Sequence, residues 1–263
     1  MVEIALTIAG SDSGGGAGIQ ADLRTFAFHK VHGTSAITCV TAQNTVGVTD
    51  VAAMTPNLVA AQLAAIFADL SVSALKTGML FNREIIETVA EFLSNCDCSS
   101  LVVDPVMVSR GGVQLIDDGA VASLKNLLLP QASIATPNIY EAQILSDREI
   151  KTIEDMKQAA VIIQQLSQKV VLIKGGGLVN DSQSTDVWFD GNNWEILTAA
   201  RIDTKHTHGT GCTLSAAITA NLALGKDLIS AVKDAKHYVT EALKHSLNIG
   251  KGSGPVGHFF PIL

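Results

Sequence analysis

Residues 206–218 read His-Thr-His-Gly-Thr-Gly-Cys-Thr-Leu-Ser-Ala-Ala-Ile, a polar turn with two glycines that runs directly into an apolar segment. Apolar residues at helical spacing predict a helix over 213–224, and Gly225 is placed to end it. Glycine-rich turns that lead into a helix are common in folds that alternate strands and helices. The segment therefore favours an α/β protein.

The amino end of this helix has the chemistry of an anion site. Its backbone N–H groups are unpaired and carry the positive end of the helix dipole. Gly209 and Gly211 leave room for a ligand to approach the backbone. Cys212 stands among these amides, where we expect the pKa of its thiol to fall. An anion site beside a candidate base suits phosphoryl transfer. A buried helix start with a structural cysteine would account for the same residues.

Length and composition indicate one soluble, reduced, cytoplasmic domain over 1–263. Hydrophobic residues make up 47% of the chain and charged residues 16%, with a mean hydropathy of +0.31. No apolar run reaches the roughly 18 residues of a membrane helix, and the first residues lack the basic segment of a signal peptide. The net charge of −7 without a basic cluster argues against nucleic acid as a partner. The four cysteines show no paired metal spacing, and Cys96 and Cys98 are too close for an ordinary disulfide.

Strand and helix patterns alternate along the chain, which predicts one doubly wound α/β domain with a mostly parallel central sheet. Strands are expected over 3–9, 35–41, 74–80, 101–107, 134–136, 170–173, 185–189 and 194–198, and helices over 19–28, 55–70, 83–93, 120–129, 152–166, 213–224 and 228–247. Ligands of such folds bind at the carboxyl ends of the strands. Polar and glycine residues collect at those ends, at Gly10-Ser11-Asp12, Gln43-Asn44, Lys76-Thr77-Gly78-Met79, Asp104, Asn138 and Lys174-Gly175. This clustering predicts a small-molecule site.

The glycine-rich loop over 14–18 has two further interpretations. It lacks the Gly-Lys-Ser/Thr of a phosphate-binding P-loop. Residues 16–21 match the loose dinucleotide pattern GxGxxA, but no acid follows about 20 residues later to bind a ribose. We favour a loop that lets the backbone crowd a small substrate, with Asp22 in the next turn as its hydrogen-bond partner. A solvated helix acid is the alternative for Asp22.

Two acids and a lysine are candidates for a nucleotide site. Asp104 lies within the apolar strand expected over 101–107, where a buried acid needs a partner, and Asp104 with Glu141 could hold Mg²⁺ through water. Asn138 and Glu141 share a helix face, a spacing that helix capping alone would also explain. Lys174 suits a nucleotide phosphate, with a snorkelling surface lysine as the alternative. His206 and His208 lack a third ligand, so we expect anion-loop or structural roles for them.

Taken together, these residues resemble the hydroxymethylpyrimidine/phosphomethylpyrimidine kinases of thiamine biosynthesis, within the ribokinase-like superfamily. The resemblance rests on motifs over 8–22, 35–45, 76–80, 103–107, 136–142, 174–176, 207–216 and 254–255, and so covers nearly the full length. It implies a three-layer fold with helices on both faces of the sheet. It also implies ATP-dependent phosphorylation of 4-amino-5-hydroxymethyl-2-methylpyrimidine and of its monophosphate, in a homodimer.

The resemblance also implies roles for individual residues. The substrate-binding set would be Gly10, Asp22, Gln43, Met79 and Val106; ATP and Mg²⁺ would be served by Asp104, Asn138, Glu141, Lys174 and Thr210; and the catalytic anion hole would be Gly209, Thr210, Gly211 and Cys212, with Cys212 as the base. Independently, the amide of Gln43 can donate and accept hydrogen bonds at once, which suits a ring nitrogen beside an amino group.

The chain departs from the family pattern over 108–114, where relatives commonly carry a lysine and an acid, so no role is transferred to Arg110. A pyridoxal-type vitamin kinase on the same fold is the nearest rival function. Gln43 and Met79 favour the pyrimidine over pyridoxal. A dinucleotide-dependent oxidoreductase and a non-catalytic pyrimidine-binding regulator are the rivals from other classes.

Overall fold

The computed structural model describes residues 2–96, 100–108, 116–178 and 183–263. Within these ranges a nine-stranded sheet has the order β3-β2-β1-β4-β5-β6-β7-β8-β9. The strands are β1 (Ile4–Asp12), β2 (His32–Gln43), β3 (Val48–Ala53), β4 (Ala74–Thr77), β5 (Leu101–Val103), β6 (Ile134–Ala135), β7 (Val170–Ile173), β8 (Gln183–Phe189) and β9 (Trp194–Ala200). The six strands from β2 to β7 in this order are parallel, and β3, β8 and β9 pair antiparallel at the edges.

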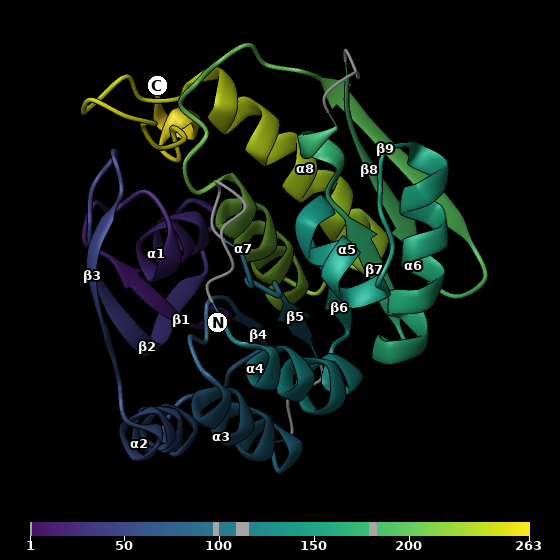
Figure 1. The fold of residues 1–263 in the computed structure, drawn as a ribbon. Helices are drawn as coiled ribbons and strands as arrows, with labels where there is room; N and C mark the ends of the chain where they lie inside the picture. Colours follow the sequence, from purple (N-terminus) through teal and green to yellow (C-terminus); the bar gives the residue numbers. More distant parts are fainter. Residues whose placement is uncertain (1, 97–99, 109–115, 179–182) are drawn as a thin grey trace.

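Helices cover both faces of the sheet (Figure 1). They are α1 (Gly18–Phe28), α2 (Pro56–Phe67), α3 (Arg83–Ser94), α4 (Asp118–Ser123), α5 (Ile139–Ser146), α6 (Ile153–Ser167), α7 (Thr210–Ala223) and α8 (Leu228–Lys244), with short π or 3₁₀ segments η1 (Leu124–Leu128), η2 (Leu129–Gln131), η3 (Gly175–Gly177) and η4 (Phe260–Ile262). In Figure 1, α1, α7 and α8 lie above the middle of the sheet, and α2, α3 and α4 lie below it. The expected three-layer α/β fold is confirmed.

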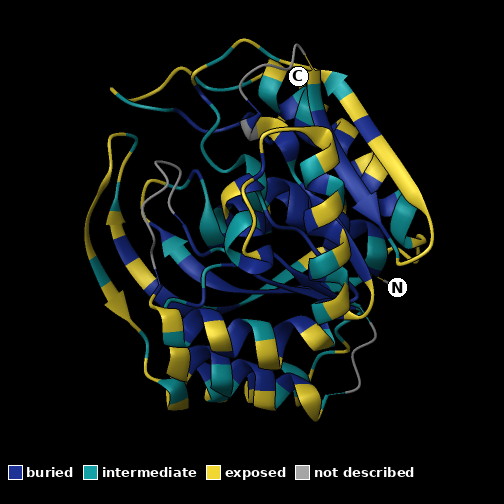
Figure 2. Ribbon diagram, turned by 45° about the vertical axis from the view of Figure 1, so that its right-hand side comes forward, coloured by how far each residue is buried: buried dark blue, intermediate teal, exposed yellow. Residues whose placement is uncertain are grey.

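Alternate residues of the central strands pack into separate apolar clusters on the two faces of the sheet. Val102 packs with residues of α7 and α8, whereas Val103 packs with residues of α3 and α6. The alternation follows from the pleat of a strand, which points successive side chains to opposite faces. A strand between two helical layers is therefore apolar on both faces. This explains the high mean hydropathy, and Figure 2 shows the central strands buried, with exposed residues on the outer faces of the helices, on the edge strands and in loops.

Sequence signals fix several helix starts. Pro56 occupies the first position of α2, and the side chain of the preceding residue, Thr55, accepts a hydrogen bond from the Leu58 amide. The Asp227 side chain accepts from the Ser230 amide and begins α8 as expected. The expected capping box at Thr152 and Asp155 begins α6.

Some expected boundaries were wrong. β5 ends at Val103, so Asp104 lies beyond the strand and not inside it. α7 begins at Thr210 and not at 213, which places Gly211 and Cys212 in the first helical turn. β3 was not expected at all, because its exposed residues show no apolar alternation to distinguish them from a loop.

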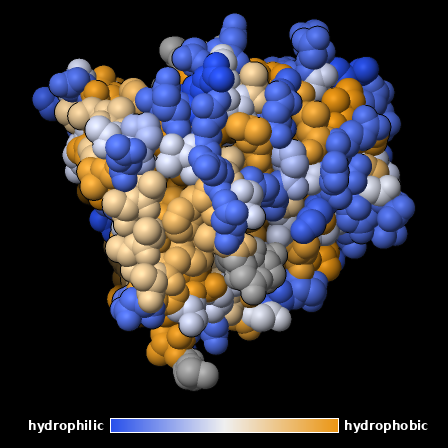
Figure 3. All heavy atoms as spheres, turned by 90° about the horizontal axis from the view of Figure 1, so that it is seen from below, coloured by the Kyte–Doolittle hydropathy of each residue, from blue (hydrophilic) through white to orange (hydrophobic). Residues whose placement is uncertain are grey.

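The face of the molecule that is seen from below carries an apolar area. None of the described helices is both long and apolar enough to cross a bilayer. Seen from below, apolar side chains gather toward the left of Figure 3, the side on which Figure 1 places α2. Leu58 of that helix is 48% exposed, and several of its alanines are exposed beside it.

Candidate active site

The polar residues singled out from the sequence gather where the parallel strands end, around the amino end of α7. Two glycine turns meet there. Gly209, the residue before α7, has φ +82°, and a Cβ on it would overlap the carbonyl oxygen of Gly16. Gly18, at the start of α1, has φ +55°, and a Cβ on it would overlap the carbonyl oxygen of Gly10. Only glycine meets both demands, positive φ and close backbone approach.

The loop between β1 and α1 is organised by one carboxylate. Asp12 is 4% exposed and accepts hydrogen bonds from the backbone amides of Gly14, Gly16 and Ala17 at 2.8, 3.0 and 2.9 Å. The Nε2 of His208 also donates to it, at 2.8 Å. Burial alone would raise the pKa of Asp12, but the His208 hydrogen bond and the loop amides outweigh it and hold the pKa below its usual range. Asp12 therefore stays ionised.

Gln43 lies beside this loop, at the end of β2. Its Nε2 is 3.4 Å from Nε2 of His208, and its Oε1 accepts from the Thr41 hydroxyl at 3.1 Å. The Ser13 hydroxyl donates to its carbonyl at 2.8 Å and accepts from its N–H at 2.8 Å. The backbone of Gln43 is thus fixed, while its amide is half-buried at the rim of the site.

Gly10 and Met79 are also brought together. A Cβ on Gly10 would come within 2.9 Å of the Met79 methyl and 2.7 Å of the Cys39 sulfur. The Thr38 hydroxyl donates to the Met79 carbonyl at 2.7 Å and holds the residue after β4 in place. Val106 is half-buried two residues beyond Asp104. The structure thus places the expected apolar ring contacts at neighbouring strand ends.

Asp22 does not fit its expected role. Its carboxylate is wholly buried, forms an ion pair with Lys76 at 2.8 Å, and accepts from the Thr7 hydroxyl at 2.7 Å. Both oxygens are therefore used inside the protein, and a direct hydrogen bond to a substrate is excluded in this arrangement. The sequence could not show that Lys76 of β4 would form an ion pair with Asp22 of α1. Lys76 lies close enough to Cys212 to favour its thiolate, whereas the Asp22 charge opposes the thiolate.

The pKa expected for Cys212 was wrong in direction. Burial raises the pKa of its thiol to about 11, and Asp22 and Asp104 add to the rise. The Lys76 charge and the Gly18 amide oppose it but do not reverse it. Desolvation of the thiolate at this half-buried residue outweighs the effect of the helix end. Cys212 is therefore chiefly a thiol at neutral pH.

On the other side of Cys212, Lys174 follows β7. Its ammonium is 2.7 Å from Asp104 Oδ1, and a Cβ on Gly211 would lie 3.5 Å from it. Burial lowers its affinity for a proton, but Asp104 and Glu141 together raise the pKa of Lys174 above its usual value. A fixed positive charge therefore stands against the first turn of α7.

Glu141 and Asn138 form a capping box at the start of α5. The Asn138 amide donates to Glu141 at 2.8 Å, and the Glu141 amide donates to Asn138 Oδ1 at 3.0 Å. Burial raises the pKa of Glu141 to about 7; Lys174 opposes the rise and Asp104 adds to it. The structure therefore shows the helix-capping interactions expected for this pair, and a further hydrogen bond from the Met107 backbone also opposes the rise in the Glu141 pKa.

Comparison with known proteins decides the family. A family model described as phosphomethylpyrimidine kinase matches residues 12–257. The hydroxymethylpyrimidine/phosphomethylpyrimidine kinase of Synechococcus elongatus is 59% identical over 261 residues, 99% of each chain. The chain belongs to the phosphomethylpyrimidine kinase family. The enzyme of the same description from Bacillus subtilis is 47% identical over 255 residues, which are 97% of this chain and 94% of that one.

Solved structures agree with this family, and some of them are described as pyridoxal kinases. The ADP complex of Bacillus subtilis pyridoxal kinase superposes with a TM-score of 0.94 at 40% identity, covering all of both chains. Phosphomethylpyrimidine kinase from Clostridium difficile 630 superposes at 0.82 with 42% identity, over 92% of this chain and 99% of that one. The resemblance inferred from the motifs is confirmed, and with it the expected enzyme class, a hydroxymethylpyrimidine/phosphomethylpyrimidine kinase.

The donor set of this family member fits a magnesium ion held chiefly by nucleotide phosphates. Asp104 and Glu141 are both 2% exposed, and the Asp104 charge contributes to the raised pKa of Glu141. The described residues include no group of three or more His, Cys, Asp or Glu side chains suited to a metal. Two carboxylates match the preference of Mg²⁺ for few protein ligands beside waters and substrate phosphates.

Several residues of the kinase site were missed. The Ser215 hydroxyl donates to Asp104 Oδ2 at 3.1 Å and the Thr136 hydroxyl to its Oδ1 at 3.3 Å. Lys76 lies in one of the family motifs but was assigned no role, and Asp12 was not predicted to be a site residue. An acid next to a glycine-rich loop was a sequence signal that could have identified Asp12. No sequence signal identifies Ser215 or Thr136, because their contacts with Asp104 join segments that are distant in the chain. Arg110 lies outside the described residues.

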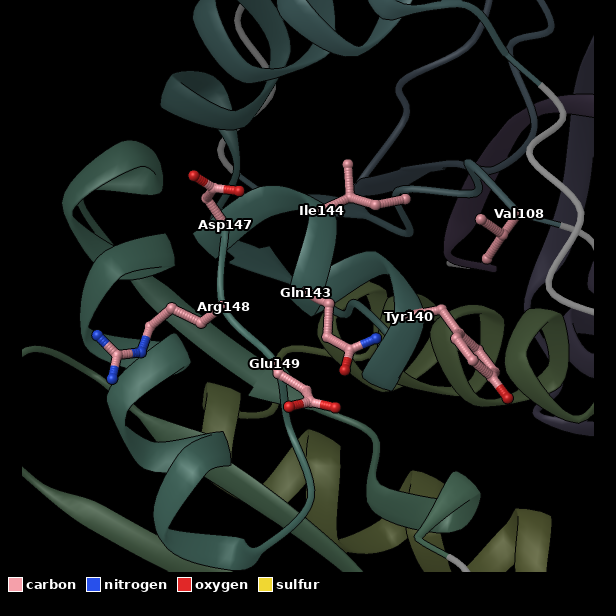
Figure 4. A pocket seen from close by; sticks show the side chains of 7 residues that line it. All are labelled: Val108, Tyr140, Gln143, Ile144, Asp147, Arg148 and Glu149. Atoms are coloured by element: carbon pink, nitrogen blue, oxygen red, sulfur yellow. The ribbon is translucent and has the colours of Figure 1, made fainter.

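A hollow of about 570 Å³ lies outside this site, along the exposed side of α5 between Val108, Tyr140 and Glu149 (Figure 4). Three of its polar side chains have partners within the protein. The Ile150 amide donates to Gln143 at 2.8 Å. Arg148 points away from the hollow and donates to Gln158 at 2.6 Å, and Glu149 pairs with Lys151 at 2.7 Å.

Proposed function

We propose that this protein transfers the γ-phosphoryl group of ATP to the hydroxymethyl group of 4-amino-5-hydroxymethyl-2-methylpyrimidine, and then to the resulting monophosphate, for thiamine biosynthesis. The observation that carries the proposal is the full-length match to kinases of this description, at 59% identity in one case. The site geometry supports it, because a candidate heterocycle site and a candidate phosphate site adjoin at the two touching glycine turns.

The heterocycle would lie between Gln43 on one side and Gly10, Met79 and Val106 on the other. The Gln43 amide would pair with a ring nitrogen and the adjacent amino group, since it both donates and accepts. A side chain at residue 10 would crowd Met79 and Cys39, so the glycine there leaves room beside them. This division of polar edge and apolar faces is typical of small-ligand sites.

The phosphates would lie against the backbone amides of Gly209, Thr210 and Gly211. Helix amino ends stabilise negative charge that grows on phosphate oxygens in the transition state. Lys174 would exchange part of its contact with Asp104 for a phosphate oxygen, and Asn138 would contribute a polar edge. Mg²⁺ held near Asp104 and Glu141 would neutralise phosphate charge.

Cys212 would accept the proton that the substrate hydroxyl loses. The raised pKa of the thiol, about 11, leaves only a small fraction as thiolate at neutral pH. Transfer to its sulfur therefore requires Lys76 and the helix amides to stabilise the thiolate as the hydroxyl attacks. Loss of a general base typically costs about 10²- to 10⁴-fold in rate, and the amide turn stabilises the transition state in addition.

An ATP-consumption assay with three acceptors tests the proposal. Hydroxymethylpyrimidine and its monophosphate should each support ADP formation with a matching phosphorylated product, and pyridoxal should support less. The pyridoxal arm is included because pyridoxal kinases superpose so closely. Turnover of pyridoxal alone, or of none of the three, would contradict the proposal. The homodimer and the cytoplasmic location remain predictions, and sedimentation equilibrium addresses the homodimer.

A further inference from the structure

The two glycine turns of the site are joined by one pair of side chains, Asp12 and His208. These residues are 196 positions apart in sequence, and their side chains meet at 2.8 Å. Asp12 is the last residue of β1 and begins the loop beside the heterocycle site. His208 immediately precedes Gly209, the residue before α7. Neither side chain has a part in the chemistry proposed above.

Each partner is anchored separately in its own segment. Asp12 is held by the amides of its loop, as described. The His208 amide donates to the Gly254 carbonyl at 3.1 Å, and the Val256 amide donates to the His208 carbonyl at 3.3 Å. His208 thus forms an isolated β-bridge with Pro255. The pair therefore connects two segments, each of which is held by its own backbone hydrogen bonds.

The surrounding packing leaves little freedom between these segments. A Cβ on Gly16 would overlap the His208 ring, and one on Gly209 would overlap the Gly16 carbonyl oxygen. The Gln43 amide is 3.4 Å from the same ring nitrogen that donates to Asp12. A shift of the His208 ring would therefore disturb both the substrate-side glutamine and the amides of the phosphate-side turn.

We propose that Asp12 and His208 are positioning residues that fix the separation between the heterocycle loop and the phosphate-binding turn. The proposal rests on the proposed function. In the productive reaction the substrate oxygen loses its proton, forms a bond to the γ-phosphorus, and the bond from that phosphorus to the β,γ-bridging oxygen breaks to release ADP. When the two turns are no longer held together, a water oxygen forms the same bond, and ADP, inorganic phosphate and a proton result.

The test compares Asp12→Asn, His208→Gln and the double variant, with both products measured in the same reaction. We expect each single change to lower phosphopyrimidine formation by about tenfold or more, because small misplacements of reacting groups are costly. The KM for ATP should stay within about twofold, while the ratio of ADP to phosphopyrimidine rises above that of the wild type. The double variant should be no worse than the poorer single variant, since the two residues act as one unit.

His245→Gln is the matched control, because this exposed histidine bonds the Glu241 carbonyl one turn back in its helix and stacks on Phe260, and its ratio should equal that of the wild type. The ratio is measured per turnover, so it does not depend on how much of a variant folds. Additive losses in the double variant, or an unchanged ratio in all variants, would overturn the positioning role. A wild type that phosphorylates no pyrimidine would instead contradict the proposed function.

Discussion

The ammonium of Lys76 lies 2.8 Å from the carboxylate of Asp22, and neither side chain has any exposed surface. Such a pair holds together because each charge compensates the burial of the other. Thr7 adds a hydrogen bond to the carboxylate. The pair spans α1 and β4 and lies beside Cys212, so it supports the floor of the site.

We predict that Lys76→Met lowers the free energy of unfolding by about 3–5 kcal/mol, because it leaves a buried carboxylate without its partner. Adding Asp22→Leu to it should restore much of that loss, because the unpaired charge is then removed as well. Lys226→Met is the control, since its ion pair with Asp234 is 41% and 54% exposed and should contribute at most about 1 kcal/mol. Urea denaturation measures all three; equal losses at Lys76 and Lys226 would contradict the prediction.

Cys212 should react slowly with iodoacetamide at neutral pH. Its raised pKa of about 11 means that the reactive thiolate forms only at high pH. In protein carrying Cys96→Ser and Cys98→Ser, we expect the alkylation rate to increase about tenfold per pH unit through pH 9. A rate that levels off below pH 9 would indicate a depressed pKa and contradict the structure.

The same residue should be needed for turnover and not for binding. Cys212→Ala should lower kcat by about 100-fold or more, while the affinity for hydroxymethylpyrimidine stays within a few fold. Isothermal titration of the pyrimidine separates the two effects. If the variant were nearly as active as the wild type, Cys212 would not be the base, and catalysis would depend on the amide turn.

How far the sequence predicts the structure depends on whether the signal is local. The start of α8 at Asp227 and the capping box of α6 follow from neighbouring residues and were predicted correctly. The family motifs likewise located the strand ends at which the site gathers. Ion pairs between distant elements were not predictable, because nothing near Asp22 in sequence identifies Lys76 as its partner.

The Cys212 error has a similar cause. The dipole of α7 is a local property and was inferred correctly. Burial of the sulfur depends on residues that arrive from α1 and β4, and it outweighs the local effect. Asp12 and His208 illustrate the same limit, since only the fold brings two separate glycine turns into contact.

Gln43→Leu should raise the KM for hydroxymethylpyrimidine by about tenfold or more, because a buried donor and acceptor on the ligand would lose their partner at about 1–3 kcal/mol. The KM for ATP should not change. Gln158→Leu, an exposed glutamine of α6, is the control and should match the wild type. Steady-state kinetics with each substrate varied in turn checks this. An unchanged KM for the pyrimidine would show that its ring does not bind at Gln43.

His258 should make the folded state sensitive to mild acid. Burial, chiefly, lowers the pKa of this 2% exposed imidazole to about 4, whereas the unfolded chain has its ordinary value of about 6.5. The unfolded state therefore takes up a proton first, and stability that is complete above pH 6.5 is lost as the pH falls toward 4. Between pH 7 and pH 5 this amounts to about 2 kcal/mol.

Urea denaturation at several pH values measures that dependence, and His258→Gln should flatten it whatever its effect at pH 7. The slope, and not the absolute stability, is the test. The same slope in both proteins would assign the acid sensitivity to other groups.

Gly209 and Gly225 provide a matched pair for the closeness of the two glycine turns. Both have φ +82°, but a Cβ on Gly225 meets nothing within 4 Å, whereas one on Gly209 overlaps the Gly16 carbonyl. Gly225→Ala should therefore cost only the left-handed backbone strain of about 1 kcal/mol and leave kcat unchanged. Gly209→Ala should cost more than that and lower kcat sharply, because the amides of the anion turn must move. Equal losses of stability and activity in the two variants would show that the turns have room to separate, and that their contact does not set the geometry of transfer.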